Sequence, residues 1–146
     1  MKMSSLDEID MKILRMLEED GRMPFTEIAE KLRLSESTVR KRVQALQRKG
    51  IIKKFTVKIE PSKLGIKTIA VVGVDVDPTR LLEVAQKLCE FKEIKWVATS
   101  TGDHMIMTEI WTRDGRELTR LISEKIGVIE GVKKICPAII LEKLKD

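Results

Sequence analysis

The spacing of the aliphatic residues changes at Gly50, and this change divides the 146-residue chain into two parts. Before Gly50, aliphatic residues recur every three or four positions, the period of a helix that buries one side. After Gly50 they alternate, as in a strand, and strand-like and helix-like runs then follow one another. The pattern therefore predicts a helical domain at residues 1–50, a connecting strand and linker at 51–67, and a mixed domain at 68–146.

The first part predicts three helices joined by short turns. Residues 5–8 have the spacing of a capping box, with Ser5 as the expected cap of the first helix. Pro24 introduces a short second helix, and a three-residue turn leads to a third helix that Ser35 caps. With the small Ala29 where the second and third helices cross, this arrangement indicates a helix-turn-helix.

The third predicted helix has one aliphatic side and one polar side. Val39, Val43 and Leu46 form the aliphatic stripe. At roughly 100° per residue, the opposite face and its flanks hold hydroxyl, amide and basic groups, namely Ser37, Lys41, Gln44 and Arg48 opposite the stripe, with Thr38 and Arg40 at the sides. Such groups bond base edges and phosphates in a major groove.

The same region concentrates the positive charge of the chain. Residues 31–58 hold ten Lys or Arg and one acid, Glu36, whereas the whole chain has a net charge of +5 and a pI of about 9.2. A basic run alone is usually a solvated face. Here, however, the basic run coincides with a predicted helix-turn-helix, and this combination favours a polyanionic partner. Double-stranded DNA is the partner that we expect.

The expected DNA contacts fall into two groups. The N-terminal part of the recognition helix reaches the bases, so we assign base reading to four side chains: Ser37, Thr38, Arg40 and Lys41. Gln44 is suited to a base or a phosphate. Phosphate binding, which gives affinity without sequence information, is assigned to Arg42, Arg48, Lys49, Lys53 and Lys54.

The second part of the chain alternates strands and helices. Strands are predicted at residues 68–76, 94–100, 104–112 and 135–144, with helices at 79–88 and from Asp114. This order, βαββαβ, is that of a ferredoxin-like antiparallel sheet with two helices on one face, so the fold class is α+β. The other face of the sheet needs a cover, and a second copy of the chain in a two-fold dimer provides one.

Several motifs occur together in a specific order along the chain. Three of them are Leu6-Asp7-Glu8-Ile9-Asp10, Leu34-Ser35-Glu36-Ser37-Thr38-Val39 and Gly50-Ile51-Ile52. This string resembles the Lrp/AsnC transcription regulators, the leucine-responsive or feast/famine proteins, over nearly the whole chain. The resemblance implies a sequence-specific regulator of pseudo-palindromic operators that dimerises through its sheets into an α/β barrel, and whose dimers often form octamers.

The resemblance also implies a small effector, usually an amino acid, bound between dimers beside a Thr-Gly turn. The corresponding residues here are Thr101, Gly102, Asp103 and His104. The family usually has an acid two positions after Asp103, where this chain has Met105. The alternative is a plain hairpin turn in which Gly102 supplies a positive φ and the polar residues are merely exposed.

Other function classes find less support in the residues. The chain has one His, no Tyr and no Gly-rich phosphate loop, so we expect neither an enzyme nor a cofactor. Two alternatives stay open: an architectural DNA-packing protein of low specificity and an enzyme like the sirohaem decarboxylases, some of which are similar in fold to the Lrp/AsnC proteins.

Cysteine content and hydropathy set further expectations. Cys89 and Cys136 are far apart and form no Cys-x-x-Cys motif, so we expect no metal site and interpret both as small buried side chains. No apolar run approaches the roughly 20 residues of a membrane span, which favours a cytoplasmic protein without a membrane partner. The absence of Asn and the abundance of Lys and Glu fit a thermophilic source.

Overall fold

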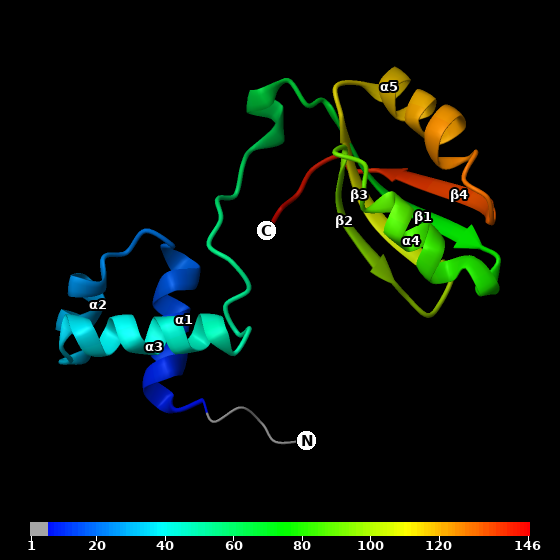
Figure 1. Cartoon of the computed structure of the whole chain (residues 1–146). Helices are drawn as coiled ribbons and strands as arrows, with labels where there is room; N and C mark the ends of the chain where they lie inside the picture. Colours follow the sequence, from blue (N-terminus) through cyan, green and yellow to red (C-terminus); the bar gives the residue numbers. More distant parts are fainter. Residues whose placement is uncertain (1–5) are drawn as a thin grey trace. The chain divides into compact units, whose positions relative to one another are not determined.

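A computed structural model describes residues 6–146, and the chain forms two compact units, Met1–Ile59 and Glu60–Asp146 (Figure 1). The division falls within the predicted connector at residues 51–67. No helix of the described residues is long and apolar enough to cross a membrane.

The first unit consists of three helices, α1 (Glu8–Glu19), α2 (Phe25–Leu32) and α3 (Glu36–Arg48). The cap of α1 is Asp7, whose carboxylate accepts a hydrogen bond from the Asp10 N–H at 2.8 Å. Ser5, the cap expected from the sequence, lies outside the described residues. An aspartate performs the same function as a serine at this position, because its oxygen satisfies an N–H of the first turn.

One aliphatic cluster holds the three helices together. Ile13 of α1, Ile28 of α2 and the stripe Val39, Val43 and Leu46 of α3 are each at most 2% exposed. The predicted side of α3 is therefore the buried one, and the predicted polar side faces outward.

The single chain does not form the strand that the sequence predicts between the units. The described chain has no strand between α3 and the short 3-10 helix η1 (Pro61–Leu64). A strand is held by ladder hydrogen bonds to a neighbour, and alternation in the sequence does not supply that neighbour. The alternating side chains of Phe55, Val57 and Ile59 are instead 48%, 73% and 49% exposed.

The second unit contains the predicted alternation of strands and helices. Its elements are β1 (Thr68–Val76), η2 (Pro78–Arg80), α4 (Leu81–Leu88), β2 (Ile94–Thr99), β3 (Ile106–Thr112), α5 (Gly115–Arg120), the π-helical turn η3 (Leu121–Ile126) and β4 (Val132–Ile139). The strands form one antiparallel sheet in the order β2-β3-β1-β4, which confirms the ferredoxin-like arrangement and the α+β class.

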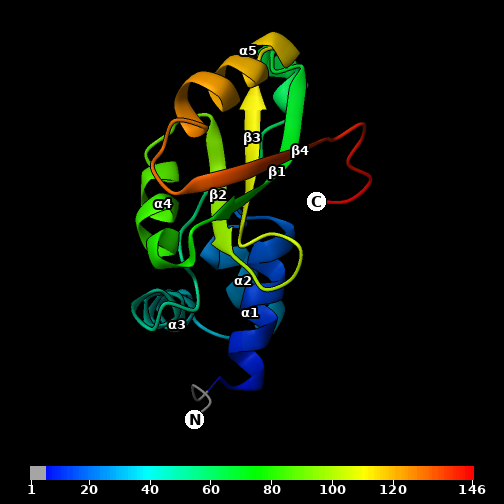
Figure 2. The same cartoon turned by 90° about the vertical axis from the view of Figure 1, so that its right-hand side faces the viewer.

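The last strand differs from the prediction in its bounds. It begins at Val132 and ends at Ile139, and the residues that follow form an irregular tail (Figure 2). This tail keeps contact with the sheet, because the Ile140 N–H donates to the Ile69 carbonyl at 2.8 Å and Lys143 Nζ lies 2.8 Å from a carboxylate oxygen of Glu109. Pro137 has no N–H to donate, and β4 is an edge strand, as expected for a strand that contains proline.

The sheet has one face covered by helices and one face without them. Ala70, Val72 and Val74 of β1 pack against α4 and α5, which lie on the same side of the sheet (Figure 1). The alternate side chains point the other way. We call this other side the helix-free face; its residues include Ile69, Val71, Gly73 and Asp75 of β1 and Met107, Glu109 and Trp111 of β3.

The prediction that both cysteines are buried is wrong. Cys89, directly after α4, is exposed, and Cys136 on β4 is half-buried. Cys89 follows Leu88, the last core residue of its helix, so the helical period carries it away from the core.

Candidate nucleic-acid interface

The start of α3 is fixed by a tight turn after α2. Arg33 has a left-handed backbone conformation with φ of 55°, and the Leu34 N–H donates to the Ala29 carbonyl at 2.9 Å. Ser35 then caps α3, because its hydroxyl accepts a hydrogen bond from the Thr38 N–H at 3.1 Å. Ala29 is only 5% exposed, as expected for a small residue at a helix crossing. The recognition helix thus begins at a defined position.

Most of the predicted DNA-contacting residues lie on the surface of the first unit. Exposed side chains are those of Ser37, Arg40, Lys41, Gln44, Arg48, Lys49, Lys53 and Lys54, while Thr38 is half-buried. The first five and Thr38 belong to α3, and Lys53 and Lys54 follow it in the connector. The helix therefore presents a continuous polar and basic face.

Hydroxyl groups gather at the N-terminal end of α3. The Ser35 hydroxyl lies 2.7 Å from the Thr38 hydroxyl and 3.1 Å from the Ser37 hydroxyl. These short contacts orient the two side chains at the end of the helix that enters a groove first in a helix-turn-helix.

Arg40 is exposed but partly engaged by its surroundings. Its guanidinium forms an ion pair with Glu36, one turn earlier on α3, and lies 5.5 Å from the centre of the Phe25 ring. An exposed i,i+4 pair of this kind contributes only about 0.3–0.5 kcal/mol. It therefore orients Arg40 without preventing the guanidinium from exchanging Glu36 for a base or phosphate.

Arg42, to which the sequence assigns a phosphate contact, is engaged by two carboxylates of its own unit. Its Nη1 lies 2.6 Å from an oxygen of Asp7 and 3.1 Å from one of Asp10, and its side chain is 28% exposed. Donation to these two carboxylates raises the pKa of Arg42. The pKa of Asp7 is lowered, first by the hydrogen bond from the Asp10 N–H and then by Arg42. Arg42 thus joins α3 to α1.

The position of Arg42 on α3 indicates that its side chain is partly buried, although its pairing with Asp7 and Asp10, which we call the Arg42 clamp, could not be predicted. Arg42 precedes Val43 and follows Val39 by three positions, so it lies beside the buried stripe rather than opposite it. Its partners, Asp7 and Asp10, stand out in the sequence only as part of the motif Leu6-Asp7-Glu8-Ile9-Asp10. Their separation from Arg42 by more than 30 residues hid the contact from local reasoning.

The predicted effector residues lie in the loop between β2 and β3. Thr101, Gly102 and Asp103 are exposed, and Gly102 has a φ of 127°, which glycine adopts without strain. His104 is half-buried, and its Nδ1 lies 3.4 Å from both carboxylate oxygens of Asp75. The structure thus separates His104, which lies against the sheet, from the exposed tip of the loop.

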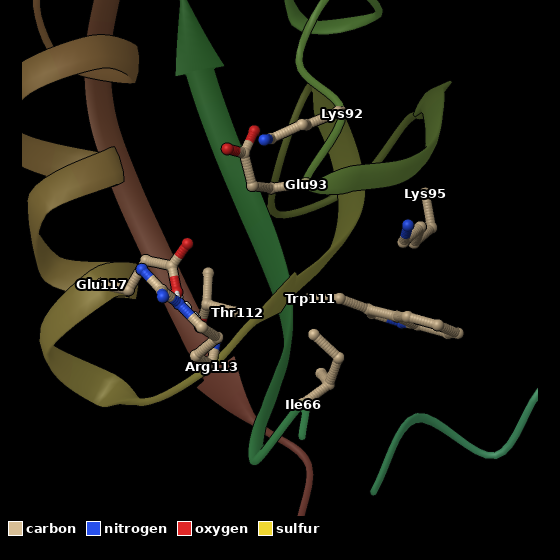
Figure 3. Close-up of a pocket in the computed structure, with 8 residues that line it drawn as sticks. All are labelled: Ile66, Lys92, Glu93, Lys95, Trp111, Thr112, Arg113 and Glu117. Carbon is tan, nitrogen blue, oxygen red and sulfur yellow. Dashed lines mark hydrogen bonds and ion pairs between the residues drawn. The ribbon is translucent and has the colours of Figure 1, made fainter. Parts of the chain in front are cut away.

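A shallow hollow of about 460 Å³ lies elsewhere on the second unit (Figure 3). Lys95 lies over the ring of Trp111, with Nζ 4.8 Å from the ring centre, and Arg113 pairs with Glu117. Trp111 is near the opposite end of β3 from the effector loop. The four predicted effector residues do not line this hollow.

Comparisons with known proteins agree with this architecture. Residues 6–47 match the AsnC-type helix-turn-helix domain, and residues 69–146 match the Lrp/AsnC ligand binding domain. The chain is 56% identical over 140 residues to the HTH-type transcriptional regulator LrpA of Pyrococcus horikoshii, covering 96% of this chain and 99% of that protein.

Solved structures share the fold over nearly the whole chain. The structure of E. coli AsnC superposes with a TM-score of 0.89 at 22% identity, covering 98% of this chain and 97% of that one. The transcriptional regulator NMB0573 of Neisseria meningitidis, in complex with L-Met, gives a TM-score of 0.90 at 22% identity, covering 97% and 94%.

Proposed function

The chain belongs to the Lrp/AsnC family of DNA-binding transcription regulators, and we propose that α3 reads the major groove of a pseudo-palindromic operator to which two copies bind. The observation that carries this proposal is the outward face of α3. Three buried anchors, Val39, Val43 and Leu46, hold the helix, and they direct its hydroxyl, amide and basic groups into solvent.

Base reading belongs to the side chains on the N-terminal half of that face. Lys41 is exposed and forms no ion pair among the described residues, so its ammonium is available to guanine O6 and N7. Arg40, Ser37 and Thr38 flank it and reach adjacent bases. Gln44, one turn further on, contacts a base or a phosphate.

Phosphate binding belongs to the end of α3 and the connector. Arg48, Lys49, Lys53 and Lys54 are exposed cations that follow one another along the chain. We remove Arg42 from this set, because two carboxylates already engage its guanidinium.

Two observations support a dimer. The helix-free face carries apolar side chains, and Trp96 of β2, whose partner in the ladder is Glu109, is 43% exposed. The connector exposes Phe55, Val57 and Ile59. A second copy would cover both surfaces, joining two sheets face to face into an α/β barrel and giving the connectors a partner. Dimers of this kind could associate further into octamers.

An effector is part of the proposal. The matched family domain is a ligand binding domain, and we propose that Thr101, Gly102, Asp103 and His104 contact an amino acid or other small molecule between dimers. The Asp103 carboxylate suits an ammonium group. Calorimetric titration with the twenty amino acids tests this, and Asp103→Asn is expected to weaken the ligand that binds.

The direct test of DNA reading is operator selection from random duplexes, followed by footprinting. We expect a single pseudo-palindromic motif, bound about 10³–10⁷ times more tightly than unrelated DNA at physiological salt. Lys41→Ala should weaken the selected operator by about 1–3 kcal/mol and relax the preference at its contacted base pair. An unchanged footprint for this variant would show that α3 is not the reading face.

The same experiment separates the alternatives. A specific-to-nonspecific ratio near one would favour an architectural DNA-packing protein. Purified protein with a Soret band and no affinity for DNA would favour an enzyme like the sirohaem decarboxylases. The relatives are named as transcriptional regulators, and we propose that this chain acts by binding DNA in the cytoplasm, without catalysis.

A further inference from the structure

We propose that Asp75, His104 and Cys136 form a zinc site on the helix-free face of the second unit. Asp75 lies on β1, Cys136 on β4, and His104 in the loop that precedes β3. One ligand atom from each residue lies within 4.8 Å of the other two, and all three residues are half-buried. This inference does not rest on the assignment of the DNA-reading face of α3.

A glycine makes room for the imidazole. Gly73 pairs with Cys136 across the β1–β4 ladder, so the two residues are neighbours on the helix-free face. A Cβ on Gly73 would lie 2.4 Å from Cγ and Cδ2 of His104. Because no other residue leaves this space, the ring lies directly on the sheet, beside both Asp75 and Cys136.

The backbone on either side of His104 is also held. The Ser100 hydroxyl donates to the His104 carbonyl at 2.8 Å, and the Ser100 N–H donates to the Met105 carbonyl at 2.9 Å. These bonds fix the residue at the base of the loop, while the loop tip at Thr101–Asp103 is exposed. The imidazole is therefore positioned before any ligand arrives, which lowers the entropic cost of binding.

The distance between His104 and Asp75 is that of two ligands rather than of a good hydrogen bond. Nδ1 is 3.4 Å from both Oδ1 and Oδ2, longer than the usual range of about 2.7–3.2 Å for an N–H···O bond. Ligand atoms on one tetrahedral zinc lie roughly 3.3–3.8 Å apart, given bonds of about 2.0–2.3 Å. A shift of about 1 Å would bring the Cys136 sulfur to the same spacing.

The donor set selects the metal. A thiolate with an imidazole favours Zn²⁺ over the harder Mg²⁺ and Ca²⁺, which take oxygen ligands. A thiolate and a carboxylate together neutralise the charge of a divalent ion. Three protein ligands leave the fourth tetrahedral position open to water or to another ligand.

The test is a titration of reduced, tag-free protein with Co²⁺, a spectroscopic substitute for zinc, in the absence of DNA. We expect one Co²⁺ per chain, a thiolate-to-cobalt charge-transfer band, and loss of that band on addition of Zn²⁺. Cys136→Ser should abolish the band, and Asp75→Asn should weaken binding by about tenfold or more. Cys89→Ser is the matched control, because Cys89 is exposed and outside the cluster, and it should bind as the parent chain does.

Several outcomes would overturn the site. They are a parent chain without a thiolate band at a tenfold excess of Co²⁺, a band that persists in Cys136→Ser, and a band that disappears in Cys89→Ser. If Cys136→Ser fails to fold, His104→Ala in the loop decides the matter, since unchanged affinity in that variant excludes the site. Operator binding is measured separately, so failure of the metal site leaves the DNA-reading proposal intact, and the reverse also holds.

Discussion

The two units of the chain complete their surfaces in different ways. In the first unit, the apolar sides of α1, α2 and α3 meet in one cluster, and what faces outward on α3 is polar and basic. In the second unit, helices cover only one face of the sheet, and Trp96 on the other face is 43% exposed. The first unit therefore buries its apolar side chains within itself and exposes a basic surface that suits a polyanion. The second unit leaves one face of its sheet without helices, and that face suits contact with another protein surface.

The largest effect is expected from a charge placed on the helix-free face. Val71→Asp puts a carboxylate beside Glu109, its partner in the β1–β3 ladder, where a second sheet is proposed to pack. We expect a monomer by analytical ultracentrifugation and a loss of operator affinity of about 10²–10⁴, because the two recognition helices are no longer linked. Leu82→Asp, at a side chain that is 71% exposed on α4, should leave both measurements unchanged.

The next effect separates the two cores. Leu46→Ala removes a side chain that is 1% exposed in the first unit, and should lower its free energy of unfolding by about 2–5 kcal/mol. Leu88→Ala makes the matched cavity in the second unit, where Leu88 is 0% exposed. Calorimetry should show each variant lowering one transition only. Equal shifts of both transitions would mean that the units unfold together.

A smaller effect distinguishes two cations of the basic segment. Arg42→Gln should destabilise the first unit by about 1–3 kcal/mol, because Asp10, whose side chain is 11% exposed, loses its partner. The same variant should leave the salt dependence of DNA binding unchanged. Lys53→Gln should do the opposite, with little change in stability and a salt slope shallower by roughly one unit. A shallower slope for Arg42→Gln would restore it to the phosphate contacts.

The smallest expected effect is on the stability of the first unit at low pH. The pKa of Asp7 is lowered in the folded chain, so the folded state binds fewer protons than the unfolded state between the two pKa values. Its stabilising contribution is complete above about pH 4 and is lost as the pH falls through the lowered value. Melting of the first unit from pH 6 to 2 should therefore show a steeper decline in the parent chain than in Asp7→Asn, which keeps a capping side chain. Parallel curves would contradict this.

Local periodicity was sufficient for much of the fold. The stripe of Val39, Val43 and Leu46 repeats within eight residues, and the βαββαβ order follows from alternating runs, so both could be predicted. The connecting strand expected within residues 51–67 is not formed by the single chain. Alternation predicts a strand, but the residues that would complete the ladder are not supplied by the described chain.

Among the candidate sites, those within one helix could be predicted from the sequence, and those that join distant residues could not. The exposed face of α3 follows from helix geometry alone. The clamp of Arg42 by Asp7 and Asp10 joins residues 35 and 32 positions apart, and no local pattern brings them together. Similarly, Asp75, His104 and Cys136 form no sequence motif, and the lack of a Cys-x-x-Cys argued against a metal site. Only the β1–β4 register and the space above Gly73 make them neighbours.

The central claim is that one face of α3, doubled by a second copy, reads DNA. The most direct measurement is guanine N7 methylation protection on the selected operator, because N7 lies in the major groove. We predict two protected patches on one side of the duplex, with centres about 34 Å or a whole multiple of that distance apart. A footprint in which no guanine N7 is protected, or a single patch bound by a stable monomer, would contradict the account.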